Sequence, residues 1–372
     1  MRETLPVLFV IMGLALLAQP AERPRARDLG LSPGILATGP INAITDVPGV
    51  LVGQTTVNEG ANVRTGVTAI LPHGGNLFQN KVPGAVFVGN AFGKLAGSTQ
   101  VEELGTIETP IVLTNTLAVG TALNAVVRWT LAQPGNDNVR SVNALVGETN
   151  DGTLNDIRGM HITREHVLSA IASAKGGVVA EGAVGAGTGT IAFGWKGGIG
   201  TSSRVVAQQD NRWTVGVLVQ TNYGGRLTMG GVPIWKEITP GSQGAASADG
   251  SCMIVVATDA PLDARDLKRL AARAVFALAR TGSTYSNGSG DFAIAFSTRA
   301  DNRVTPAPGA QARTFLPTDG VSALFEAALD ATEEAVYNSL LKATDTTGNG
   351  RTIRALPIEP LRTVLKKYSI TK

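Results

Sequence analysis

Short apolar runs separated by glycine-rich turns recur through the first two thirds of the chain, and this pattern predicts β-strands. Farther along, residues 253–258 form a continuous apolar and β-branched run, which is typical of a strand buried on both faces. The full set of expected strands lies at 50–52, 67–71, 85–88, 111–113, 190–193, 203–207, 213–219, 253–258 and 292–297.

Four segments are expected to be helical, at 117–131, 163–174, 263–280 and 321–343. Thr163 is a suitable N-cap for the second of these, with Glu165 in its first turn. The stretch 239–250 is small and polar without an apolar anchor, so we expect a linker there. Because strands and helices are intermixed along the whole chain, a layered α/β or α+β fold is indicated.

The N-terminus has the pattern of a secretory signal. Arg2 precedes an apolar run from Val7 to Ala18, which is too short to span a membrane. The alternative, a buried N-terminal helix, is disfavoured because Pro6 and Pro20 bracket the run. We therefore expect a signal peptide at 1–21 and a single catalytic domain at 22–372, exported to a bacterial periplasm or secreted. After signal removal we expect no association with a membrane.

Composition excludes several classes of protein. The 372 residues include 45 glycines, one cysteine and three histidines, with a formal net charge of +3. A lone Cys252 allows neither an internal disulfide nor a cysteine-based metal site, and no metal or organic cofactor is expected. Without a dense basic tract, nucleic-acid binding has little support. The glycine-rich stretch at 185–189 lacks the spacing of a dinucleotide-binding loop and is expected to be a structural turn.

The junction between Gly250 and Ser251 carries the most informative chemistry. Cleavage of the peptide bond before Ser251 would give this residue a free α-amine beside its own hydroxyl, so that the amine could serve as the base without a histidine. The simpler alternative is that Ser251 only begins a strand after a loop. Cys252 is a poorer nucleophile candidate, since consecutive strand residues point to opposite faces and it is expected to be buried.

In addition to this junction, segments along nearly all of the mature chain resemble a known family, in the same order. The resemblance is to the self-processing family of DmpA-type L-aminopeptidase/D-esterases and β-peptidyl aminopeptidases. The segments that carry it are NAITDVPGVLV at 42–52, RTGVTAIL at 64–71, 97–105, TNT at 114–116, ET at 148–149, LND at 154–156, AKGGVVAEG at 174–182, GGIGTSSR at 197–204, VGVLVQTNYG at 215–224, Gly250-Ser251, MIVVATDAPL at 253–262, 289–298 and 331–335.

The resemblance implies a role for each matching residue. Ser251 falls on the nucleophile, exposed when cleavage after Gly250 yields an α chain of 22–250 and a β chain of 251–372. Asn222 falls on an oxyanion-hole amide, and Glu148 falls on the acid that binds the free amino group of the substrate. Ser289 and Asp291 fall on groups that orient the nucleophile and its amine.

The family also implies a four-layer α/β/β/α sandwich, of the type shared with ornithine acetyltransferases. It implies as partners short peptides, amides or esters with a free N-terminus, and as assembly a homo-oligomer, typically a tetramer, of α/β heterodimers. Two positions depart from the pattern: Asp291 stands where β-peptidyl enzymes have Glu, and Asn150 stands where some members have Tyr.

Three functions therefore remain to be compared. The first is a serine aminopeptidase acting through an acyl-enzyme on Ser251, including on β-amino acid residues. The second covers two other enzymatic activities. One is an L-aminopeptidase/D-amino acid esterase-amidase without β-preference. The other is an ornithine acetyltransferase-like acyl transferase, which is disfavoured because those enzymes use Thr as nucleophile. The third is a non-catalytic binding protein, disfavoured because all matching site residues are present together.

Overall fold

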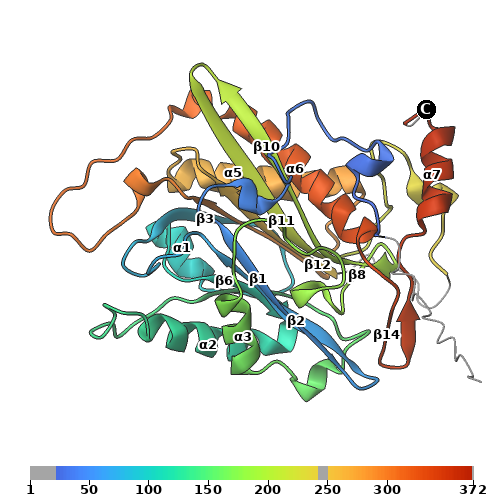
Figure 1. Cartoon of the computed structure of the whole chain (residues 1–372), viewed down its shortest axis with the longest axis horizontal. Coiled ribbons are helices and arrows are strands. Elements are labelled where there is room, and N and C mark those ends of the chain that lie inside the picture. The colour runs from blue at the N-terminus through green and yellow to red at the C-terminus, as the bar shows by residue number, and fades with distance from the viewer. Residues whose placement is uncertain (1–21, 242–249, 371–372) are drawn as a thin grey trace, which may run out of the picture.

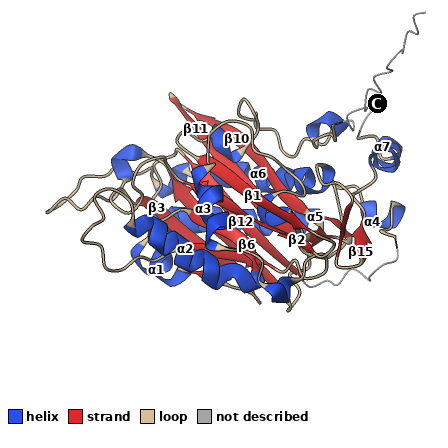
Figure 2. Ribbon diagram, turned by 60° about the horizontal axis from the view of Figure 1, so that its bottom comes forward, coloured by secondary structure: helices blue, strands red, loops and turns tan. Residues whose placement is uncertain are grey.

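Two β-sheets face one another, and each is covered on its outer side by helices (Figures 1 and 2). The computed structural model describes residues 22–241 and 250–370. The first sheet has the order β1 (Leu51–Glu59), β2 (Val63–Leu71), β6 (Ile111–Asn115), β7 (Leu145–Thr149) and β4 (Leu95–Ala96). The second has the order β10 (Gly198–Gln208), β11 (Asn211–Asn222), β12 (Gly250–Thr258), β13 (Ser289–Ser297), β3 (Val82–Ala91) and β5 (Thr106–Ile107).

Helices α2 (Val119–Leu131) and α3 (Arg164–Ala172) cover the first sheet, and α5 (Ala264–Thr281) and α6 (Ser322–Leu341) cover the second (Figure 1). The expected four-layer α/β/β/α sandwich is thereby confirmed. The smaller elements are α1 (Ser98–Leu104), α4 (Ile234–Glu237), α7 (Ile358–Lys367) and the hairpins β8 (Ile191–Ala192) with β9 (Trp195–Lys196) and β14 (Thr346–Gly348) with β15 (Arg351–Ile353).

Strand β12 lies in the middle of the second sheet and serves two cores at once. Ile254 and Val256 face the core under α5 and α6, whereas Met253 and Val255 belong to the core between the two sheets. Since both faces of the strand are covered, both sets of side chains must be apolar. This explains why the sequence here is a continuous apolar run instead of an alternating one.

Most predicted elements are present, and the differences have physical causes. Strands β10 and β11 begin earlier or extend farther than the expected 203–207 and 213–219. The first half of β10 contains glycines where other backbone lies directly on it: a Cβ at Gly200 would stand 1.9 Å from the carbonyl oxygen of Ala335 in α6, and one at Gly198 would stand 2.2 Å from the carbonyl oxygen of Gly182. Strand β7 and helix α7 were not expected. The proposed signal peptide at 1–21 and most of the linker at 239–250 lie outside the described residues.

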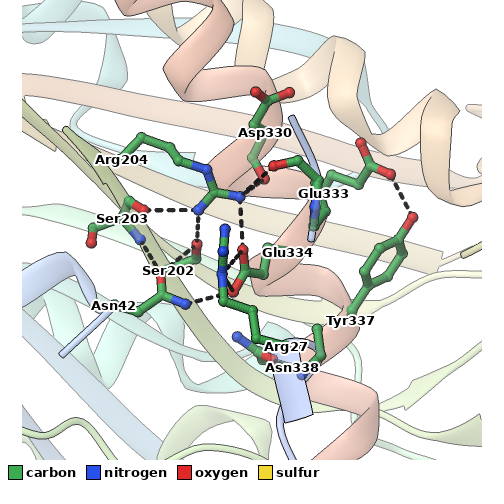
Figure 3. A network of polar contacts seen from close by, with 12 residues as sticks. Arg27, Asn42, Ser202, Ser203, Arg204, Asp330, Glu333, Glu334, Tyr337 and Asn338 are labelled. Atoms are coloured by element: carbon green, nitrogen blue, oxygen red, sulfur yellow. Dashed lines mark hydrogen bonds and ion pairs between the residues drawn. The ribbon is translucent and has the colours of Figure 1, made fainter. Parts of the chain in front are cut away.

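A buried polar network ties the N-terminal segment to the outer helix α6 (Figure 3). The guanidinium of Arg204, on β10, is fully buried and pairs with Glu334 of α6 at 2.7 Å. Arg27 pairs with the same carboxylate at 3.0 Å, and Asn42 also donates to it. Since a buried charge is tolerated only when paired, this network holds three distant segments in one arrangement. Among the described residues, no helix is long and apolar enough to cross a membrane.

Candidate active site

Ser251 stands in a row of residues across the second sheet. It pairs with Asn222 on the antiparallel strand β11 and with Gly290 on the parallel strand β13. Residues directly opposite one another in an antiparallel pair share a face and have neighbouring side chains. The missing side chain at Gly290 leaves room on the other flank, since a Cβ there would lie 3.1 Å from the Ser251 hydroxyl oxygen. The Phe92 carbonyl oxygen also packs there, 2.8 Å from the position that this Cβ would take, so the hydroxyl lies between Asn222 and closely packed backbone.

Gly250, which precedes Ser251, is confined by the neighbouring strand. A Cβ at this position would lie 2.2 Å from the carbonyl oxygen of Asn222 and 2.5 Å from the Cα of Tyr223. No residue other than glycine fits such a contact without displacing the backbone. The junction singled out in the sequence is thus a tightly enclosed peptide at the beginning of β12.

A pocket of about 420 Å³ opens at this junction. Gly250 and Ser251 form one side of it, and Glu148 and Asn150 from the end of β7 form another. The segment after β3 completes the wall with residues 91–94. The pocket thus joins the ends of strands from both sheets, and it brings together three of the residues that the sequence placed in the site, Gly250, Ser251 and Glu148.

Glu148 is held in a defined position inside this pocket. Its side chain is 2% exposed, and one carboxylate oxygen accepts a hydrogen bond from the backbone N–H of Lys94 at 2.9 Å, while the other accepts from the Thr116 hydroxyl. The Lys94 ammonium lies 3.8 Å away but is half exposed. Gly93 must be small, since a Cβ there would approach Glu148 Oε1 to 3.2 Å. A fixed, nearly buried carboxylate in a small pocket is suited to a cationic group.

Asn222 has a defined amide orientation. Its Oδ1 accepts a hydrogen bond from the backbone N–H of Ile191 at 3.0 Å. The two donor protons on Nδ2 therefore remain for the other side of the amide. Ser251 is its cross-strand neighbour, so an amide donor is available beside the serine hydroxyl.

Asp291 lies on the opposite face of the sheet from the Ser251 side chain. The register pairs it with Cys252, whose side chain is packed in the core under α5 and α6. Its carboxylate is fully buried, and within the part of the chain that the structure describes neither oxygen has a partner with hydrogen-bond geometry. Burial raises the pKa of Asp291 to about 6, and the nearby Ser289 hydroxyl offsets part of the effect. Any action of Asp291 on Ser251 must therefore pass through the backbone plane of β12.

Cys252 is fully buried, as expected, and burial raises the pKa of its thiol well above the ordinary value. A thiol that stays protonated is a weak nucleophile. Among residues 22–241 and 250–370, no group of three or more histidine, cysteine or acidic side chains could hold a metal ion.

Sequence reasoning missed several residues of the site. Thr116 and Lys94 contact Glu148, and Gly93 and Gly290 leave the space around it and around Ser251. Their contacts join segments far apart in the chain, so no local pattern marks them. The importance of Gly290 becomes visible only when β13 is paired with β12, which places it beside Ser251.

The four-layer sandwich, with a serine near the start of a central strand, has the fold class of the Ntn hydrolases, as its match to a solved structure of that fold shows. A β-peptidyl aminopeptidase of Sphingosinicella microcystinivorans is 44% identical, over 96% of each chain. A β-aminopeptidase structure from a Burkholderia species is 39% identical, with a TM-score of 0.86 over 93% of this chain and 99% of that one. The L-aminopeptidase D-Ala-esterase/amidase of Ochrobactrum anthropi, a prototype serine aminopeptidase with a variant Ntn-hydrolase fold, is 38% identical, with a TM-score of 0.87 over 94% of this chain and all of the other.

The model of peptidase family S58 matches residues 42–353, and the chain belongs to this family. The expected family and the expected activity, that of a serine aminopeptidase, are thereby confirmed.

Proposed function

We propose that this protein cleaves its own chain after Gly250 and then removes N-terminal residues, including β-amino acid residues, from short peptides and amides. The observation that carries the proposal is the pocket in which the Gly250–Ser251 junction faces Glu148. The similarity to a β-peptidyl aminopeptidase and to a β-aminopeptidase supports the substrate class.

Self-cleavage begins with attack of the Ser251 hydroxyl on the carbonyl carbon of Gly250. The C–N bond breaks, the acyl group moves to the serine oxygen as an ester, and the nitrogen becomes a free amine. Water then hydrolyses the ester and leaves Gly250 as a carboxylate. The enclosed geometry of Gly250 supports this step, since only a residue without a side chain can occupy that position.

In turnover, the Ser251 hydroxyl attacks the carbonyl carbon of the first substrate residue. The hydroxyl proton passes to the free α-amine of Ser251. The Asn222 amide donates to the oxyanion, a contact of a kind worth about 2.7–4 kcal/mol. The leaving amine takes the proton as the C–N bond breaks, and water resolves the acyl-enzyme. The α-amine lies in the backbone plane at the end of β12, so Ser289 and Asp291 can influence it from the far face.

Glu148 would pair with the free ammonium of the substrate. An acylated N-terminus would leave this nearly buried carboxylate with no cation other than the half-exposed Lys94 ammonium 3.8 Å away, which disfavours internal cleavage. Because the O. anthropi relative is named as an L-aminopeptidase and D-Ala-esterase/amidase, a preference for such substrates is the second candidate. Release rates from β-alanyl, L-alanyl and D-alanyl p-nitroanilides distinguish the two.

The test of processing is a denaturing gel with N-terminal sequencing. We expect two polypeptides, the smaller beginning at Ser251. Ser251→Ala is expected to stay a single, inactive chain, while Cys252→Ala is expected to be processed and active. An active single chain, or a processed Ser251→Ala variant, would overturn the proposal.

Export and assembly form a separate proposal. We infer a signal peptide at 1–21, a periplasmic or secreted enzyme, and a homo-oligomer of α/β heterodimers. Support for the signal boundary comes from Arg23, whose guanidinium donates to the carbonyls of Leu341 and Leu356 and so belongs to the folded domain. The intact mass of the exported protein and its size by light scattering test both points.

A further inference from the structure

The amide of Asn222 is oriented by a loop that contains a fully buried lysine. This loop, defined here as residues 187–197, runs between the turn at Gly185–Gly187 and strand β10. It supplies the Ile191 N–H that bonds to Asn222 Oδ1, and it docks on the end of β11 through the Phe193 N–H and the carbonyl of Tyr223 at 2.8 Å.

Lys196 gathers the backbone of the loop around its ammonium group. Its side chain is 0% exposed, and Nζ donates to the carbonyls of Gly187 at 2.9 Å, Thr190 at 2.8 Å and Gly197 at 2.8 Å. An ammonium has three donor protons, and three carbonyl oxygens face it. Thr190 directly precedes Ile191, so Lys196 fixes the peptide whose N–H orients Asn222.

The charge of Lys196 is partly opposed by Asp151, which follows the end of strand β7. Burial lowers the pKa of Lys196 to about 7, and the negative charge of Asp151 opposes that effect. Asp151 follows Glu148 by three positions and is itself held by Asn155 at 2.9 Å. A Cβ at Gly189 would lie 2.9 Å from the Cβ of Asp151, so the loop and the end of β7 are in direct contact.

A buried ammonium is costly unless every donor is used and the charge is opposed. An apolar side chain of similar length at position 196 could occupy the same space inside the loop. The three carbonyl oxygens that Lys196 binds would then lose their donor. The ammonium of Lys196 binds the carbonyl of the Thr190–Ile191 peptide, and the N–H of that same peptide donates to Asn222. This location of a costly group indicates a role in the chemistry at Ser251.

We propose that Lys196 is a positioning residue that holds the Thr190–Ile191 peptide so that the Asn222 amide nitrogen is directed at the oxyanion formed on Ser251. The inference rests on the proposed function, because it assigns Lys196 to the oxyanion hole of that reaction. Lys196 itself contacts neither the substrate nor the reacting atoms.

A double-mutant cycle with Lys196→Met and Asn222→Ala tests this role, since coupling appears only if the two residues act together. Removing one oxyanion donor typically lowers kcat about 10²–10³-fold. We expect Lys196→Met to lower kcat by about 10–100-fold with little change in KM. In the Asn222→Ala background, the same substitution should change kcat less than about threefold. The matched control is Lys81→Met, which removes the Lys81–Glu108 pair at 2.7 Å away from the pocket and should leave kcat unchanged.

Four further outcomes keep the test decisive. Equal losses of kcat in both backgrounds, or a Lys196→Met enzyme with wild-type kcat, would overturn the inference. If Lys196→Met does not fold, Lys196→Gln, which retains two donor protons, is placed in the same cycle and should give a smaller loss with the same coupling. If Asn222→Ala alone leaves kcat unchanged, the oxyanion role in the proposed function fails instead.

Discussion

At the scale of the residue, Asp291 has the least favourable surroundings in the site region. Its carboxylate is fully buried on the face of the sheet that carries Cys252, and among the described residues neither oxygen has a partner with hydrogen-bond geometry, although the nearby Ser289 hydroxyl offsets part of the cost of its charge. Burial raises its pKa from 3.8 to about 6. The folded protein therefore binds this proton more tightly than the unfolded chain does.

This difference gives Asp291 its own contribution to the pH dependence of stability. Between pH of about 4 and 6 the folded state holds this proton more often than the unfolded state, so the contribution of Asp291 to the free energy of unfolding falls as pH rises, by about 3 kcal/mol in total. Asp291→Asn removes the uncompensated charge. We expect it to be more stable than its parent by up to about 3 kcal/mol above pH 6 and no more stable below pH 4.

Urea unfolding of Ser251→Ala with and without Asp291→Asn, at pH 4 and pH 7.5, measures this effect in a constant covalent state. A gain of equal size at both pH values, or a loss of stability at pH 7.5, would show that the buried carboxylate is not the cause.

At the scale of the element, the contact between α6 and β10 sets the distance between the outer helix and the second sheet. Gly200 lies directly under α6, close to the carbonyl of Ala335 and the backbone of Ser339. The helix approaches this closely only because β10 has no side chain here. The same feature hides β10 from pattern analysis, since its buried residues are glycines, serines and threonines as well as apolar residues.

Gly200→Ala is expected to destabilise the fold by about 3 kcal/mol or to prevent folding, because overpacking against a backbone atom cannot be relieved by a side-chain rotation. Gly176→Ala is the matched control: no atom of the described residues lies within 4 Å of a Cβ there, and we expect a change within about 0.5 kcal/mol. Thermal unfolding of both variants decides, and a wild-type melting temperature for Gly200→Ala would contradict the close packing.

An element can be predicted from the sequence when its local pattern of apolar residues matches the faces that it buries. The four long helices and the continuous run of β12 belong to this group. Strand β7 was missed because LVGET is short and includes Gly147, which lies against the Met253 sulfur. Helix α7 was missed although its last turn carries the basic residues typical of a helix end.

The residues of the site also differ in whether the sequence alone could reveal them. Ser251 could be inferred from local chemistry, because a hydroxyl residue stands between a linker and a buried strand. Glu148 and Asn222 were identified only through the family resemblance. Lys94, Ile191 and Lys196 could not be found, since their roles depend on contacts that exist only after both sheets have assembled.

At the scale of the whole molecule, cleavage after Gly250 would divide the sandwich between two chains that cannot form it separately. The second sheet would take β10, β11, β3 and β5 from the α chain and β12 and β13 from the β chain. Strand β12 would pair with β11 across the two chains, and β13 with β3. The network of Figure 3 would also cross between them, because Arg27 and Arg204 belong to one chain and Glu334 to the other.

Glu334→Gln should therefore weaken the association of the two chains. It leaves the fully buried Arg204 without its carboxylate, and breaking a buried pair typically costs about 3–5 kcal/mol. We expect the processed variant to dissociate at lower urea concentration than the wild type, as followed by size-exclusion chromatography. Glu359→Gln, at an exposed pair, is the control, and equal dissociation midpoints for all three proteins would contradict the role of the network.

The most direct test of the central claim is the mass of the enzyme during turnover. The processed protein is mixed with a β-alanyl ester, quenched in acid and digested, and the peptide that begins the smaller chain is analysed by tandem mass spectrometry. The account predicts one added β-alanyl group, as an ester on the Ser251 oxygen, that disappears as the substrate is consumed. An adduct on Cys252, or turnover without any acyl group on Ser251, would contradict it.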